Sequence, residues 1–169
     1  GPAPSPGSFV LAPLPFGVNG YISNNVSSID LVITNVALPR WDGLAGGNWD
    51  IGLTTNWVNL GTGLPTYFAQ GNRVLFDDNA AGTTTVNISD NVSPESVIVN
   101  NNTAVYTFAG TGKITGSASL NKQGTGTLAI NNSGGNNYTG PTTISGGVLS
   151  VTSLANGGLP SAIGASSSD

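Results

Sequence analysis

Short runs of β-forming residues return at nearly regular intervals within residues 111–153, and this internal repeat constrains the fold more than any other feature of the sequence. The runs align with their copies at offsets of 24, 24 and 21 residues: 114–116 with 138–140, 117–120 with 141–144, and 128–130 with 149–151. Turns rich in Gly and Asn separate them. Strand-length runs at a fixed period predict a chain that coils into a β-solenoid.

Stacking of such turns also explains the polar, weakly charged composition. Each strand of a solenoid pairs with strands of the turns on either side, so backbone groups stay unsatisfied only at the two ends. We expect Val, Ile, Leu and Phe to point inward. Thr, Ser and Asn should point outward, where stacked Asn and Thr form hydrogen-bonded ladders. Glycines are expected at corners that need a positive φ.

The composition argues against several classes of function. The 169 residues carry four basic and eight acidic side chains, a net charge of −4, and no Cys, His or Met. The length fits one domain with appended arms. So few basic residues cannot neutralise a row of phosphates, so we expect no nucleic-acid partner. No apolar run is long enough for a membrane span. Such a composition is typical of bacterial surface and secreted β proteins.

Three regions differ in composition. Residues 1–38 combine a Pro-rich arm with one expected strand at 28–36. Asn19-Gly20 predicts a turn between them. The whole region fits the end of a preceding unit. Residues 39–72 hold all three tryptophans at spacings of eight. They predict an aromatic cap, because terminal turns of solenoids must shield apolar surface. Residues 73–169 hold the solenoid repeats and a polar C-terminal tail that frays unless it is docked.

Strands are expected in the repeat region wherever β-branched and aromatic runs lie between Gly-, Ser- and Asn-rich clusters. The expected strands are 73–77, 84–89, 96–100, 105–108, 113–115, 118–120, 127–130, 138–139, 142–144 and 148–151. No window shows helical periodicity with caps. The fold class is therefore all-β.

Residues 124–151 resemble the autotransporter-associated β-strand repeat, whose pattern runs G-x-G-x-L…N-x-Y-x-G-x-T-x-I…G-x-L. The pattern is filled by Gly124, Gly126, Leu128, Asn137, Tyr138, Gly140, Thr142, Ile144, Gly147 and Leu149. The Trp block and the following QGNRVLFDD resemble the segment that precedes this repeat in very large secreted bacterial proteins. The resemblance implies a right-handed parallel β-helix in an exported or cell-surface protein. It implies no catalytic residues, because the motif is structural.

No catalytic residue, metal site or cofactor is expected. Without His or Cys the chain has no Ser-His-Asp or Cys-His machinery. The neighbouring carboxylates Asp77 and Asp78 would point to opposite faces of a strand. Residues 77–79 and Asp90 offer oxygen ligands suited to Ca²⁺, but they match no calcium-binding loop. We favour turn formation as their role.

Five aromatic residues form the candidate ligand site: Trp41, Trp49, Trp57, Tyr67 and Tyr138. Their rings could stack on sugars while nearby Asp and Asn bind hydroxyl groups. A carbohydrate-binding module for cell-surface or extracellular polysaccharide is therefore the alternative function. The competing interpretation, which we favour, places the tryptophans in the core of the cap.

The sequence as a whole predicts a non-catalytic β-helix module with a structural or adhesive role, extracellular or on a bacterial cell surface. Open ends of a solenoid expose strand edges, and such edges template pairing with another chain. We therefore expect self-association by stacking or strand addition at the ends, with surface filaments as its extended form.

Overall fold

The computed structural model describes residues 10–12, 14, 18–25, 27–36 and 38–167, and this part of the chain is all-β, as expected. Its strands are β1 Val18–Asn24, β2 Ile29–Val36, β3 Pro39–Trp41, β4 Asn48–Trp49, β5 Trp57–Asn59, β6 Pro65–Thr66, β7 Arg73–Asp77, β8 Thr85–Ile88, β9 Asn91–Val92, β10 Ser96–Asn100, β11 Val105–Ala109, β12 Lys113–Ile114, β13 Ser119–Gln123, β14 Thr127–Ile130, β15 Thr142–Ile144 and β16 Val148–Val151. Within these residues no helix is long and apolar enough to cross a membrane.

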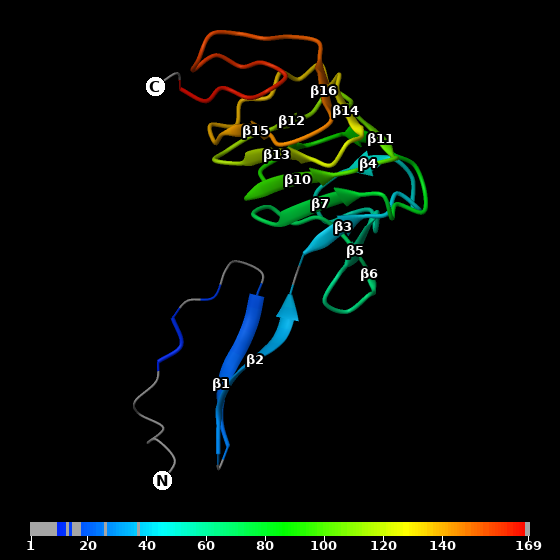
Figure 1. The fold of residues 1–169 in the computed structure, drawn as a ribbon. Coiled ribbons are helices and arrows are strands. Elements are labelled where there is room, and N and C mark those ends of the chain that lie inside the picture. Colours follow the sequence, from blue (N-terminus) through cyan, green and yellow to red (C-terminus); the bar gives the residue numbers. More distant parts are fainter. Residues whose placement is uncertain (1–9, 13, 15–17, 26, 37, 168–169) are drawn as a thin grey trace.

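Strands β7 to β16 coil into a β-solenoid, with turns stacked along one axis (Figure 1). The successive turns are β7–β9, β10–β12, β13–β14 and β15–β16. Each turn gives one strand to a seven-stranded sheet and one to a five-stranded sheet, while β9 and β12 pair on a third face. All pairs between turns are parallel, and paired residues lie 21 to 23 positions apart. The predicted β-solenoid is confirmed.

The predicted alignment of the repeat is confirmed in one strand pair and wrong in another. Leu128 pairs with Leu149, at the predicted offset of 21. Leu120 pairs with Thr142 instead of Ile144, an offset of 22 where the sequence suggested 24. The sequence alignment matched Leu120 to the next apolar residue of the repeat. It was wrong because the residue stacked on Leu120 in the next turn is the polar Thr142. The hydroxyl of Thr142 is used, since it lies 2.6 Å from the Tyr138 hydroxyl and within hydrogen-bond distance.

Inward side chains of successive turns stack into apolar columns, and outward side chains are more exposed, as the alternation predicted. Two columns lie in the seven-stranded and five-stranded sheets: Val74, Val97 and Leu120, and Tyr106, Leu128 and Leu149. Burying one such side chain contributes about 1.5–3 kcal/mol. The stacked columns are therefore the main source of the stability of the coil.

Polar side chains form ladders between turns, as expected for stacked Asn and Thr. The Asn87 side-chain amide donates to Asn48 Oδ1 at 2.8 Å across β8 and β4. At a corner of the coil, the backbone N–H of Thr125 donates to Asn102 Oδ1 at 3.3 Å. These bonds link neighbouring turns without apolar contact.

Glycines occupy corners where neighbouring turns approach closely. Gly124 has a φ of 69°, and a Cβ there would lie 2.3 Å from the carbonyl oxygen of Asn101 in the turn below. Gly110 has a φ of 100°, and its Cβ would lie 2.4 Å from the carbonyl oxygen of Ile88. A side chain at either corner would push two turns apart, so these glycines are required by the stacking.

Residues 50–72 interrupt the coil and close its first end, as predicted for an aromatic cap. In this segment β5 pairs antiparallel with β3, and β6 pairs antiparallel with β5. The rings of Trp49 and Trp57 lie 5.4 Å apart, and Trp49 also contacts Phe68 at 5.5 Å. Phe76 of β7 lies 5.3 Å from Trp57. Aromatic edge-to-face packing thus joins the cap to the first full turn.

A two-stranded hairpin, β1–β2, projects from the capped end of the solenoid (Figure 1). Its second strand confirms the one predicted at 28–36. The predicted turn at Asn19-Gly20 is wrong, because both residues lie within β1. The pairing shifts there, from Asn19 with Asn35 to Gly20 with Ile33, which makes a β-bulge. Most of the Pro-rich arm, residues 1–9, 13 and 15–17, lies outside the described residues.

The C-terminal segment docks on the third face of the last turns. The backbone N–H of Ser161 donates to the Asn136 carbonyl at 3.1 Å, and Ala165 N–H donates to the Tyr138 carbonyl at 2.8 Å. Asn136 also donates through its side-chain amide to the Ala162 carbonyl at 2.8 Å. The predicted strand at 138–139 is wrong, since these residues form no strand, and the nearby Asn136 makes only an isolated antiparallel bridge with Ser161.

Candidate functional site

Four of the five aromatic residues of the candidate ligand site are buried. Trp41, Trp49, Trp57 and Tyr138 are at most 1% exposed. The three tryptophans are the centre of the cap, and the Trp41 indole N–H donates to the Thr83 carbonyl at 2.7 Å. Rings inside the core cannot stack on a sugar. The five aromatic residues therefore do not form a surface platform, which corrects the grouping suggested by the sequence.

The two tyrosines of that candidate site are far from equivalent. Tyr67 follows β6 in the cap and is 51% exposed. Tyr138 lies in the core near the opposite end, where burial raises the pKa of its hydroxyl to about 12. Its hydroxyl lies 2.6 Å from that of Thr142, which in turn donates to the Ile163 carbonyl at 3.1 Å. Tyr138 thus fastens the C-terminal segment.

The carboxylates of the repeat region are engaged by backbone and side-chain groups. Asp78 accepts backbone N–H groups of Asn102, Thr103 and Ala104 at 2.8–3.0 Å. These donors, that of Ala104 foremost, hold the pKa of Asp78 well below its usual range. Asp77 lies 3.9 Å from the Arg40 guanidinium. No cluster of three or more Asp or Glu residues is present in the described part of the chain.

Lys122 is a core residue that the sequence did not identify. Its side chain is fully buried in the inward column that also contains Phe76 and Val99. The ammonium donates to the carbonyl of Gln123 at 2.6 Å and more weakly to that of Gly124 at 3.3 Å. Burial lowers the pKa of Lys122. Backbone carbonyl oxygens surround the ammonium, and no carboxylate of the described residues lies within salt-bridge distance of it. Lys122 therefore has no partner for nucleophilic or acid–base chemistry.

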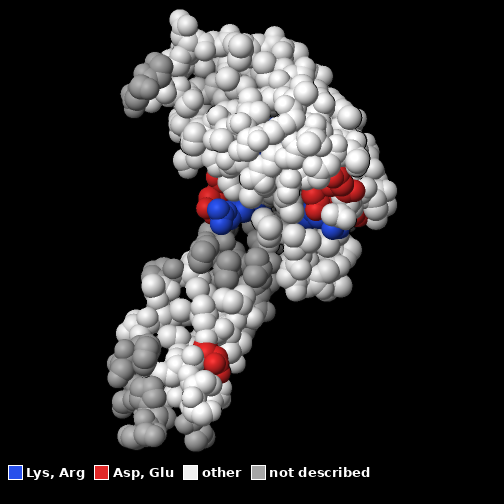
Figure 2. All heavy atoms as spheres, in the orientation of Figure 1, with Lys and Arg blue, Asp and Glu red and all other residues white. Residues whose placement is uncertain are grey.

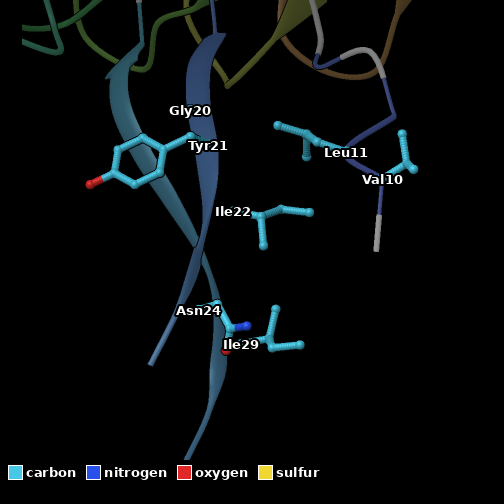
Figure 3. A pocket seen from close by; sticks show the side chains of 7 residues that line it. All are labelled: Val10, Leu11, Gly20, Tyr21, Ile22, Asn24 and Ile29. Carbon is cyan, nitrogen blue, oxygen red and sulfur yellow. The ribbon is translucent and has the colours of Figure 1, made fainter. Parts of the chain in front are cut away.

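An apolar groove separates the N-terminal arm from the β1–β2 hairpin. It has a volume of about 430 Å³, and Figure 3 shows Leu11 pointing toward Ile22 across it, while Tyr21 points to the other side of the strand. Ile29 completes the apolar wall. The groove holds no charged lining residue, so it offers shape and apolar contact but no reactive group.

The end of the solenoid opposite the cap leaves two strands unpaired on one side. Strands β15 and β16 are the last strands of the seven-stranded and five-stranded sheets. Ile144, which is in register with the buried Lys122 of the turn below, is 56% exposed. Leu149 and Val151 are only partly buried. The core of the coil is therefore incompletely covered at this end.

Charge is distributed unevenly between the two ends. Figure 2 shows basic and acidic side chains gathered over the capped end of the solenoid, and the turns beyond it bear none on this face. Residues 124–168 contain no Asp, Glu, Lys or Arg. In the part of the chain that the structure describes, the open end is thus uncharged as well as incompletely covered. A search of the sequence for catalytic groups could not have found this end of the solenoid, because the sequence feature that marks it is the absence of charged residues.

Comparison with known proteins places the open end within a repeat of one family. Residues 120–151, from β13 to β16, match the passenger-associated-transport-repeat family. The resemblance that the sequence motif suggested is confirmed on these residues. The match covers 32 of the 169 residues, so it characterises the last turns and not the hairpin or the cap.

A second similarity is to an adhesin. The chain is 52% identical over 52 residues to the adhesin BmaC autotransporter of Brucella suis biovar 1 (strain 1330). The matched stretch is 31% of this chain and 2% of the adhesin, so the chain spans a very small part of that protein. No solved structure matches the chain. The passenger-associated transport repeat implies a secreted or surface-exposed protein, and both similarities suggest a non-catalytic role.

Proposed function

We propose that the chain is a structural and adhesive β-solenoid module of a secreted or surface-exposed protein, and that it is non-catalytic. The coil supplies a stiff body, and the outward side chains supply the contact surface. The similarity to an adhesin over 52 residues supports the adhesive part. The stacked parallel turns support the structural part.

The observation that carries this proposal is how the repeat uses its motif residues. Leu128 is fully buried in a core column, Tyr138 is buried and bonded to Thr142, and Gly124 permits a close corner. The two side chains most similar in chemistry to catalytic groups, the Asp78 carboxylate and the Lys122 ammonium, are hydrogen-bonded to backbone groups. The motif residues and these two charged side chains thus serve packing and coiling, which supports a non-catalytic role.

An adhesion assay tests the proposal. Beads coated with the purified chain would be placed on cultured epithelial cells, glass, cellulose and chitin, and the fraction retained under flow would be counted. We expect retention on at least one surface above that of beads coated with the Leu128→Asp variant. That variant should not fold, because it buries an unpaired carboxylate at a cost of about 3–5 kcal/mol. Equal retention on every surface would contradict the adhesive role.

A polysaccharide partner stays a prediction with weak structural support, since only Tyr67 of the five candidate aromatic residues is more than one-third exposed. The same assay addresses it through Tyr67→Ala. Loss of retention on cellulose or chitin alone would favour a glycan partner. Unchanged retention would remove Tyr67 from consideration.

A further inference from the structure

The connection that leads from β16 to the docked C-terminal segment is exposed along its whole length. It comprises residues 152–160, and every one of them is exposed. The equivalent connections in the turns below are shorter: residues 89–90, 110–112 and 131–135. Exposed loops of small and polar residues are where a chain is most open to solvent and to chemical change. A reactive group in the last turn would be most accessible there.

Asn156 and Gly157 form a turn in the middle of this connection. The Asn156 carbonyl accepts the N–H of Leu159 at 3.1 Å, which closes a β-turn over Gly157 and Gly158. Gly158 has a φ of 82°, as the third residue of a type II turn requires. Among the described residues, no group accepts the Gly157 N–H, and none is hydrogen-bonded to the Asn156 side chain. The side-chain amide and the following backbone nitrogen are thus neighbours without competing partners.

We propose that Asn156 is a site of spontaneous deamidation, in which its side-chain amide reacts with the backbone nitrogen of Gly157. Hydroxide removes the proton from the Gly157 nitrogen, whose electron pair then attacks Cγ of Asn156. The Cγ–Nδ2 bond breaks, and Nδ2 leaves as ammonia after it takes a proton from water. The product is a cyclic succinimide, in which the Gly157 nitrogen is bonded to both carbonyl carbons of Asn156.

Water then opens the succinimide at either of its two carbonyl carbons. Attack at Cγ breaks its bond to the Gly157 nitrogen and leaves an aspartate with the original backbone. Attack at the backbone carbonyl carbon leaves an isoaspartate, in which the chain runs through Cγ and is longer by a methylene group. Overall, either route consumes water and releases ammonia, so the reaction needs no enzyme, metal or oxidant.

The structure selects this asparagine from the others of the chain. Glycine is the most favourable following residue, because it has no Cβ to hinder its nitrogen and leaves the backbone free to rotate. Asn is followed by Gly only at Asn19 and Asn156. Asn19 lies in β1 in register with Asn35, so strand pairing holds its backbone extended. Asn132, which precedes a serine, is buried, and its amide donates to the Gly112 carbonyl at 3.0 Å.

Deamidation would change the last turn in two ways. It would place a carboxylate within residues 124–168, which hold no Asp, Glu, Lys or Arg. The isoaspartate form would also lengthen the β-turn, whose Gly158 N–H donates to the Ser166 carbonyl at 3.0 Å. That bond ties the β-turn to the C-terminal segment, in which the Ala165 N–H donates to the Tyr138 carbonyl at 2.8 Å. We therefore expect the C-terminal segment to loosen as the isoaspartate accumulates.

Mass spectrometry of the folded chain would test the proposal. The purified chain is incubated at neutral and at mildly alkaline pH, and samples are digested with pepsin in acid, where ring closure stops because hydroxide is scarce. Tandem spectra then give the modified fraction at Asn156 and at Asn19 separately. The matched variant is Gly157→Ala, which adds a methyl group beside the attacking nitrogen. Gly157 has no positive φ, so alanine fits its position in the turn, and far-UV circular dichroism would verify the fold.

We expect modification at Asn156 to be about tenfold or more faster than at Asn19, because Asn19 reacts only when the hairpin opens. The rate should rise in proportion to hydroxide concentration and fall severalfold in Gly157→Ala. Amide hydrogen exchange of the aged chain should accelerate at Gly158 and Ala165 and stay unchanged in the cap. An unmodified Asn156, equal rates at Asn19 and Asn156, or an unchanged rate in Gly157→Ala would overturn the proposal. Unchanged exchange at Ala165 after modification would overturn the expected loosening.

Discussion

The capped and open ends of this solenoid solve the same physical problem in different ways. Among the described residues, both ends present apolar columns and strand edges on which no further turn is stacked. The capped end uses 23 residues, 50–72, to bury three tryptophans and Phe68. The open end uses a short docked segment held by Asn136, Tyr138 and Thr142 of β15, which covers only part of the last turn.

One end of a solenoid can therefore be closed by a packed aromatic core while the other leaves part of its apolar columns accessible. Aromatic rings at the capped end exclude water from the core, while Leu53, Leu64 and Tyr67 around them remain exposed. At the open end the polar network of Asn132 and Asn136 fixes the C-terminal segment, with the Asn132 amide donating to Asn136 Oδ1 at 2.9 Å. Buried hydrogen bonds specify position but bury little apolar area. The two ends should therefore differ in energy as well as shape.

The largest expected effect comes from breaking the cap. Trp49→Ala should lower the free energy of unfolding by about 3–5 kcal/mol, because Trp49 is fully buried and its removal leaves a large cavity. Urea denaturation followed by far-UV circular dichroism would measure it. Tyr67→Ala, which removes an exposed ring of the same segment, should change stability by less than about 0.5 kcal/mol. Similar losses in both variants would show that the cap is not a packed core.

A second comparison uses the same residue type in neighbouring turns. Leu128 is fully buried, while Leu149 directly above it is only partly buried. Leu128→Ala should cost about 2–5 kcal/mol. Leu149→Ala should cost less than half as much, because less area is removed from water. Equal losses would mean that the last turn is already covered, and would count against an open end.

A smaller effect is expected from Tyr138→Phe, which removes the hydroxyl that bonds to Thr142. The loss should be about 1 kcal/mol. Amide hydrogen exchange should accelerate at Ala165, whose N–H donates to the Tyr138 carbonyl, and remain unchanged in the cap. Acceleration throughout the chain would show that the docked segment and the coil open as one unit.

The smallest effect concerns pH. The pKa of Lys122 is lowered by burial, so the unfolded chain binds more protons than the folded chain as pH approaches 10.5. Stability should therefore rise with pH on the alkaline side of neutrality, up to about pH 10. Above pH 10 it should fall, because the Tyr138 pKa of about 12 exceeds that of the unfolded chain.

Thermal unfolding of Lys122→Met between pH 7 and pH 10 would test the first of these trends. We expect the rise with pH to disappear, and stability at pH 7 to be unchanged or higher, because a buried cation without a carboxylate is replaced by an apolar chain. Lys113→Met, a change of the same charge at a less buried side chain, should keep the rise. A persisting rise in Lys122→Met would assign it to another group.

Much of the coil could be predicted because its signal is local. Strands β7, β10, β14, β15 and β16 have the bounds that β-branched runs between turn residues indicated. The short strands β3 to β6 were missed because two or three residues leave no alternation to detect. Lys122 was missed because a lysine in a strand predicts a solvated side chain, and only the stacking of turns puts it inside. Residues 1–38, 39–72 and 73–169 remain a predicted division.

The candidate ligand residues show the opposite limit. Aromatic content drew attention to the Trp block, but burial depends on how residues 50–72 fold back on β3. The edge at β15 and β16, by contrast, has no distinctive residue type. Edges depend on which strands lack a neighbour, and that is a property of the assembled stack.

The concentration of all three tryptophans in the cap has a practical consequence for spectroscopy. Trp41, Trp49 and Trp57 lie within 17 residues at one end, so intrinsic tryptophan fluorescence observes that end alone. Repeat proteins whose turns contact only their neighbours can lose cooperativity and unfold in stages. A fluorescence melt could then look complete and two-state while distant turns had already melted, and a dye or an introduced tryptophan near β16 would be needed to observe them.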